Sequence, residues 1–184
     1  MSDQVPEDAV TTARLSIPFT FLTTILDPGL KWCSGLVGWH IPSDDRARVG
    51  LTAISGQEAN WTERLQKPIP YAHGLYQFER LGGVRGVLYD DVTRPMALAA
   101  CVKAGVPAPV TTLGAWRMLA TDDALATAFA RLLLYTDVLP NPAMDDEEGW
   151  YRYYLNLWRP GSPSRARWSG VFPQALDAVR ATSK

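Results

Sequence analysis

Few residues of this chain can bind a metal or act as a nucleophilic thiol. Its 184 residues include only two cysteines, Cys33 and Cys101, and two histidines, His40 and His73. Neither an HExxH motif nor a paired Cys/His spacing occurs, which argues against the common zinc sites. Both cysteines lie in apolar segments without CxxC spacing, so we expect two free, buried thiols, with a disulfide between them as the alternative. We therefore expect no metal and no other cofactor.

The chain also lacks an excess of charge and a long apolar run. Eighteen Lys and Arg against nineteen Asp and Glu leave a net charge of -1. Such a balance provides no broad positive field for a polyanion, so we do not expect nucleic acid as a partner. The most apolar stretch, residues 19–39, is broken by Asp27 and Pro28, so it contains no uninterrupted apolar run of the roughly 20 residues that span a bilayer. We expect a kinked helix or helix pair there and no stable membrane insertion, with an uncleaved membrane signal as the alternative.

Length and apolar content favour one packed domain. A chain of 184 residues with 47% hydrophobic residues is within the usual range for a single globular domain. Helix start and stop signals recur along it, while strands are hard to place. The predicted helices cover residues 43–60, 93–103, 111–119, 121–135, 145–159 and 172–181. We predict a mainly α domain over residues 18–184, with little or no β structure, behind a flexible extension over residues 1–17.

One carboxylic acid lies in the apolar stripe of the helix predicted at residues 43–60, whose expected N-cap is Ser43. The stripe consists of Ala47, Leu51, Ile54, Glu58 and Trp61. Glu58 is its only charged residue, and loss of hydration among apolar side chains raises the pKa of a carboxyl group. Glycoside cleavage needs such a proton donor, because a glycosidic oxygen is a poor leaving group until it is protonated. The alternative is a structural Glu58 paired with Arg85 or Arg131.

A second segment gives this acid a context. The chain contains GQEANW at residues 56–61, AHGLYQFE at 72–79 and the glycine-rich LGGVRGVL at 81–88. Together these resemble the first two motifs of the lysozyme-like lytic transglycosylases and goose-type lysozymes, in which a helix ends in Glu-Ser and a Gly-Leu-Met-Gln segment follows. The layout is more similar still to small lysozyme-like proteins of tailed bacteriophages and prophages, and that similarity extends to residues 130–137 and 150–161.

The resemblance implies a lysozyme-like catalytic domain with a cleft for peptidoglycan glycan strands. Its reaction would be cleavage of the β-1,4 bond between N-acetylmuramic acid and N-acetylglucosamine. Glu58 matches the catalytic acid of the first motif, and Gln77 matches the glutamine that lies in the cleft. Gly74 either lets the backbone approach the glycan or serves a turn with positive φ. Tyr76 is the candidate aromatic residue of the cleft, and Tyr135 matches the tyrosine that orients the acid.

Two departures from the family pattern affect the expected chemistry. Ala59 replaces the usual serine and removes a hydroxyl group from the cleft. Glu79 adds a second carboxylate, which permits hydrolysis with inversion if it faces Glu58 with a water between them. If Glu79 points away, the C6 hydroxyl of the muramic acid is the nucleophile and the product is a 1,6-anhydro sugar. A solvent-facing Glu79 paired with Arg80 or Arg85 is the structural alternative.

The phage resemblance implies an endolysin or a virion-associated lysin. Such a protein is made in the host cytoplasm without a cleaved signal peptide and reaches the wall after holin-type release, or acts within a particle beside other virion proteins. One rival is a cysteine amidase or peptidase built on Cys33 or Cys101 with His73. The other is a non-catalytic lysozyme-like protein of a virion or one that binds the cell wall.

Overall fold

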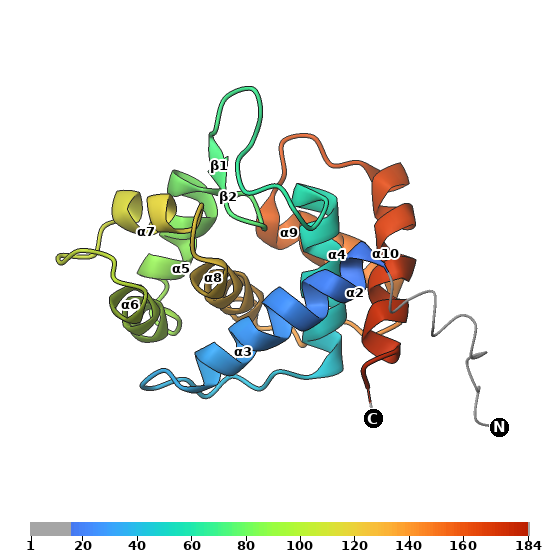
Figure 1. The fold of residues 1–184 in the computed structure, drawn as a ribbon, viewed down its shortest axis with the longest axis horizontal. Helices are drawn as coiled ribbons and strands as arrows, with labels where there is room; N and C mark the ends of the chain where they lie inside the picture. The colour runs from blue at the N-terminus through green and yellow to red at the C-terminus, as the bar shows by residue number, and fades with distance from the viewer. Residues whose placement is uncertain (1–15, 184) are drawn as a thin grey trace.

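The computed structural model describes residues 16–183, so nearly all of the predicted extension at residues 1–17 lies outside the described residues. The described chain is mainly helical, as predicted (Figure 1). Its elements are α2 (Ile17–Phe21), the π-helical turn η1 (Leu22–Leu26), α3 (Asp27–Ser34), α4 (Asp45–Ala59), β1 (Ala72–His73), β2 (Phe78–Glu79), the kinked segment η2 (Arg80–Val84), α5 (Arg85–Tyr89), α6 (Arg94–Lys103), α7 (Thr112–Met118), α8 (Asp123–Tyr135), α9 (Glu147–Trp158) and α10 (Arg165–Arg180). None of the described helices is long and apolar enough to cross a membrane.

Side-chain caps begin most of the predicted helices. The carboxylate of Asp44, rather than the predicted Ser43, accepts the backbone N–H of Ala47 at the start of α4. Asp122 caps α8 in the same way. The last helix is longer than predicted: α10 begins at Arg165 rather than at residue 172. The side chain of Ser164 caps its start.

The core lies around α8 and α4. Every residue of α8 from Leu125 to Leu134 is buried, and α3 packs along this helix. Helix α4 packs against α10, and the two lie side by side in Figure 1. The close packing extends to α9: a Cβ on Gly50 of α4 would lie 2.2 Å from the ring of Trp150. The core therefore holds α4 on several sides.

Helix α4 is buried on more sides than the predicted apolar stripe implies. All residues from Val49 to Ala59 are buried except Glu58, which is half-buried. The helix is thus enclosed around its whole circumference rather than along one face. Glu58 is therefore the most exposed residue of this part of α4.

A small antiparallel hairpin follows α4, although no strand was predicted there. Ala72 pairs with Glu79 and His73 pairs with Phe78. Two residues per strand are too few to show a period of two in the sequence, which is why the pattern of residues did not reveal them. The hairpin extends from the helical body at one side of the molecule (Figure 1).

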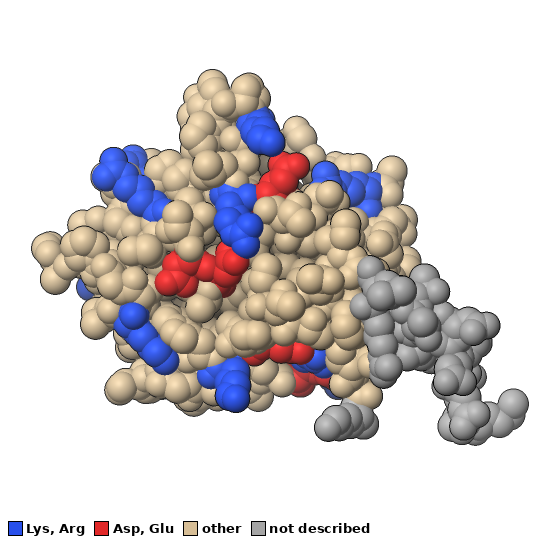
Figure 2. Space-filling view, viewed as in Figure 1, with Lys and Arg blue, Asp and Glu red and all other residues tan. Residues whose placement is uncertain are grey.

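The charged side chains form no broad field on the face drawn in Figure 2. Acidic and basic groups are interspersed there, as the net charge of -1 leads one to expect. The ion pair between Arg64 and Asp123, with 2.6 Å between its closest atoms, links the loop after α4 to the start of α8. Both partners are partly exposed, so the pair contributes little to stability but orients the loop.

Candidate active site

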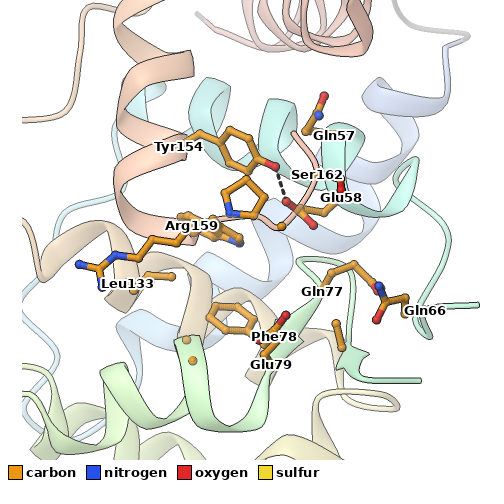
Figure 3. Close-up of a pocket in the computed structure, with 16 residues that line it drawn as sticks. Gln57, Glu58, Gln66, Gln77, Phe78, Glu79, Leu133, Tyr154, Arg159 and Ser162 are labelled. Atoms are coloured by element: carbon orange, nitrogen blue, oxygen red, sulfur yellow. Dashed lines mark hydrogen bonds between the residues drawn. The ribbon is translucent and has the colours of Figure 1, made fainter. Parts of the chain in front are cut away.

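A cleft of about 370 Å³ opens where the end of α4, the hairpin and the end of α9 meet (Figure 3). Glu58 lies on one wall, while Gln77 and Glu79 come from the hairpin on the facing wall. The loop after α9 forms a third side with residues 159–162. The volume and the few convergent polar groups are typical of a site for a small molecule or a part of a polymer.

Glu58 is held by one short hydrogen bond. The hydroxyl of Tyr154 on α9 donates to Glu58 Oε1 at 2.5 Å, which is drawn as a dashed line in Figure 3. Tyr154 is itself 1% exposed, and its ring stacks on Trp168 of α10 with 5.3 Å between the ring centroids. The donor is therefore fixed by the core, and the carboxyl group of Glu58 has a defined direction.

The surroundings of Glu58 favour its protonated form. Burial raises the pKa of Glu58 from 4.5 to about 7. The hydrogen bond from Tyr154 and the positive charge of Arg167 act in the opposite direction, and the negative charge of Glu79 adds to the increase. A carboxyl group with this pKa exchanges a proton readily near neutral pH, which is what a general acid requires.

No arginine forms an ion pair with Glu58 among the described residues. Arg167 directs its guanidinium at the carbonyl oxygen of Gly56, with Nη2 at 2.9 Å, and so anchors the last turn of α4. Arg131 donates to Pro42 O at 2.9 Å, and Arg85 lies over the ring of Tyr89. The predicted structural pairs with Arg85 and Arg131 are therefore not formed.

The facing wall supplies an amide and a second carboxylate. Gln77 is half-buried, and its Nε2 donates to the carbonyl oxygen of Gly74 at 2.9 Å, which holds the side chain at the cleft. Glu79 is exposed and lines the cleft, close enough for its charge to raise the pKa of Glu58. Within residues 16–183 Glu79 forms no ion pair, so the pairs with Arg80 and Arg85 that were the alternative are absent.

Two predicted substrate contacts lie elsewhere. Tyr76 is 0% exposed and packs edge-to-face with Phe21, so its ring cannot reach a substrate. Tyr135 ends α8 outside the cleft, where its hydroxyl lies 3.3 Å from His40 Nε2. The contact with the acid that was assigned to Tyr135 is made by Tyr154 instead. In the sequence Tyr154 lies four residues from both Trp150 and Trp158, and this spacing alone could not distinguish a core residue from one at the cleft.

A glycine is needed at position 74 because of backbone packing rather than because of a ligand. Its φ is +77°, and a Cβ there would lie 2.7 Å from the carbonyl oxygen of Leu119. The glycine thus allows the hairpin to turn against the end of α7. Gly74 does not line the cleft.

The glycine-rich segment and the end of α9 contribute cleft residues that were not among the predicted site residues. A Cβ on Gly83 would lie 2.5 Å from the ring of Phe78, so a glycine is needed where η2 passes the hairpin. Trp158 donates its indole N–H to Tyr76 O at 3.1 Å and so joins α9 to the hairpin. The glycines at 82–83 in the sequence were a usable signal for Gly83, whereas Trp158 was indistinguishable from a core residue.

The thiols and histidines form no second centre. Cys33 and Cys101 are both free and fully buried, as predicted. Burial raises the pKa of each to about 12, so neither is an activated thiolate. His73 stacks on Trp116 instead, with its Nδ1 2.9 Å from Trp116 O. Among the described residues no group of three or more His, Cys, Asp or Glu is arranged to hold a metal ion.

Comparisons of the chain with protein-family models, with curated proteins and with solved structures found no match.

Proposed function

We propose that this protein is a peptidoglycan-degrading glycosidase of lysozyme or lytic transglycosylase type. It cleaves the β-1,4 bond between N-acetylmuramic acid and N-acetylglucosamine, and Glu58 is its general acid. The observation that carries the proposal is the pKa of Glu58, about 7, in a polar cleft that is open to solvent. The motif resemblance names the substrate, since it pairs this acid with the segment that bears Gln77 and Glu79.

The proposed reaction starts with protonated Glu58. It donates its proton to the glycosidic oxygen, and the bond from that oxygen to C1 of the muramic acid breaks. The carboxylate that forms still accepts the hydrogen bond from Tyr154, which stabilises it at the moment when the proton leaves. The hydrogen bond from Tyr154 thus orients the carboxyl group of Glu58 and makes it easier to deprotonate.

The second carboxylate decides the product. Glu79 is exposed on the facing wall and free of an ion pair within residues 16–183, so it is available to take a proton from a water that attacks C1. That route gives a new reducing end. In the other route the C6 hydroxyl of the muramic acid attacks C1 and gives its proton to the carboxylate of Glu58, so a 1,6-anhydro end forms without water.

Glu58→Gln tests the proposal. This variant keeps the fold and the size of the side chain but has no proton to donate, so release of glycan fragments from purified peptidoglycan falls by at least about a hundredfold. Glu63→Gln is the matched control, since Glu63 is exposed and its side chain does not line the cleft. Undiminished release by Glu58→Gln refutes the role of the acid.

Mass analysis of the fragments identifies the reaction. Reducing ends mean hydrolysis, and Glu79→Gln then lowers the rate about a hundredfold as expected for loss of a general base. Anhydro ends mean a transglycosylase, and the same variant then retains most of its rate. A wild-type protein that binds the wall but releases no fragments contradicts the proposal and leaves the non-catalytic alternative.

A further inference from the structure

The last turn of α4 carries a second polar side chain at the cleft, that of Gln57. Gln57 lines the cleft next to Glu58, yet it is only 8% exposed. In Figure 3 both the amide of Gln57 and the hydroxyl of Tyr154 lie above the carboxyl group of Glu58. A buried polar side chain costs stability unless it forms hydrogen bonds. The partners of this amide therefore indicate what Gln57 does.

One hydrogen bond connects Gln57 to the start of α10. Its Nε2 donates at 3.3 Å to the carbonyl oxygen of Ser164, the N-cap residue of that helix. In the other direction, Arg167 of α10 donates at 2.9 Å to the carbonyl oxygen of Gly56, one residue before Gln57. The end of α4 and the start of α10 are thus bonded to each other in both directions, and the amide of Gln57 has a fixed position between them.

The amide also contacts Tyr154. Burial raises the pKa of the Tyr154 hydroxyl, the charge of Glu58 adds to this increase, and a hydrogen bond from Gln57 acts in the opposite direction. A hydrogen bond lowers the pKa of a phenol when it is donated to the phenol oxygen, because it stabilises the phenolate. The amide N–H groups of Gln57 therefore face both Ser164 O and the oxygen of Tyr154, whose own hydrogen is donated to Glu58 Oε1.

The carbonyl end of the same amide has no partner. Gln57 Oε1 is buried and accepts no hydrogen bond from any residue in the range 16–183. An unpaired buried carbonyl costs free energy, whereas an apolar side chain of similar shape avoids this cost. Stability alone therefore does not account for a glutamine at this position. The direction of its N–H groups toward Tyr154 does.

We propose that Gln57 is a positioning residue of this site: its amide N–H groups hold the hydroxyl of Tyr154 on the carboxyl group of Glu58. This inference rests on the proposed function of Glu58 as the acid, and it adds a residue that acts on the acid through another. In a chain of hydrogen bonds each bond polarises the next. The hydrogen bond from Gln57 makes Tyr154 a stronger donor to the carboxylate that Glu58 becomes when its proton leaves.

The pKa of Glu58 tests this role. It is measured by NMR titration of protein labelled with ¹³C in its glutamate carboxyl groups, and Glu58→Gln assigns the signal. Gln57→Met keeps the length of the side chain but has no N–H group, so the pKa of Glu58 rises by about 0.3–0.5 pH unit. In the Tyr154→Phe background the same replacement causes no further rise, because the hydroxyl that transmits the effect is missing.

Gln174→Met is the matched control. Gln174 is an exposed glutamine of α10 that also donates to a backbone carbonyl, that of Gly170, and it does not line the cleft. Its replacement leaves the pKa of Glu58 unchanged. The other charged groups that act on Glu58 are Arg167 of α10 and Glu79 of β2. Both are present in every protein of this comparison, so their effects cancel.

Stability separates a positioning role from a merely structural one. Gln57→Met removes the unpaired carbonyl together with the hydrogen bonds, so we expect little change in the midpoint of urea unfolding. A merely structural glutamine predicts a lower midpoint and an unchanged pKa of Glu58. Gln57→Leu is a second variant without N–H groups, and circular dichroism checks that both variants fold.

The possible outcomes separate this proposal from the glycosidase proposal. A rise in the pKa of Glu58 that requires the hydroxyl of Tyr154 supports the role of Gln57. No rise, or an equal rise with and without that hydroxyl, overturns it, whether or not the wild-type protein releases wall fragments. A rise that requires Tyr154 in a protein that releases no fragments overturns only the glycosidase proposal.

Discussion

Replacing Glu58 by glutamine changes how the stability of the protein depends on pH. In the folded protein the pKa of Glu58 is about 7, compared with 4.5 without the protein environment. Below pH 4.5 the group is protonated in both the folded and the unfolded chain, so it has no effect on the pH dependence. Between pH 4.5 and 7 the unfolded chain ionises first, and the folded state loses stability as the pH rises.

The size of the effect follows from the two pKa values. Each pKa unit corresponds to about 1.4 kcal/mol, so the folded wild-type protein loses up to about 3 kcal/mol between pH 4 and pH 8 through Glu58 alone. This is a large share of the roughly 5–15 kcal/mol by which domains are stable. Glutamine is neutral at every pH and removes the loss. The free energy of unfolding of Glu58→Gln minus that of the wild-type protein therefore increases by about 3 kcal/mol from pH 4 to pH 8.

Urea unfolding of both proteins across this pH range measures the difference directly, and contributions from titrating groups that do not interact with Glu58 cancel in it. In thermal unfolding the same change corresponds to roughly 6–12 °C in the midpoint difference. Parallel pH profiles for Glu58→Gln and the wild-type protein refute the raised pKa, and with it the physical basis for a general acid.

Two further predictions concern the neighbours of the cleft. Tyr154→Phe removes the hydrogen bond that lowers the pKa of Glu58. The alkaline limb of the pH–activity profile therefore moves upward by about one pH unit. A downward shift contradicts the effect of this hydrogen bond on the pKa of Glu58. Gly74→Ala destabilises the protein by about 2–3 kcal/mol in urea unfolding, because of the positive φ and the carbonyl oxygen of Leu119. The matched change Gly86→Ala, in α5 with nothing near its Cβ, is neutral or stabilises by about 0.5–1 kcal/mol.

Much of the helical layout was accessible from local signals. Capping and acidic residues at helix starts, a proline in a first turn and apolar spacing act within a few residues, and they predicted α4, α6, α8 and α9 to within about two residues at each end. The two-residue strands and the early start of α10 escaped prediction. The strands are paired by a turn rather than by their own pattern, and α10 is stabilised by its packing on α4.

Some residues of the candidate site were likewise predictable from the sequence, and others were not. Glu58 was recognisable because a carboxylate among apolar neighbours is a local anomaly, and Gln77 and Glu79 because they follow it in a recognisable motif. Tyr154 was not, since it belongs to a helical row of aromatic residues, and such rows are usually core. Tyr76 and Tyr135 were predicted to lie near the substrate because of their positions relative to the motifs. Such a position in the sequence does not determine the direction in which a ring points.

The sequence by itself determined the helical class, the buried thiols and the acid on α4, because each depends on residues close together in the chain. Only the tertiary structure decided what surrounds that acid. Tyr154 and Glu79 reach Glu58 from segments 96 and 21 residues away, and their directions depend on how α9 and the hairpin pack against α4. The pKa of Glu58 is set by this assembled environment, since desolvation and the facing charges exist only once the helices have come together.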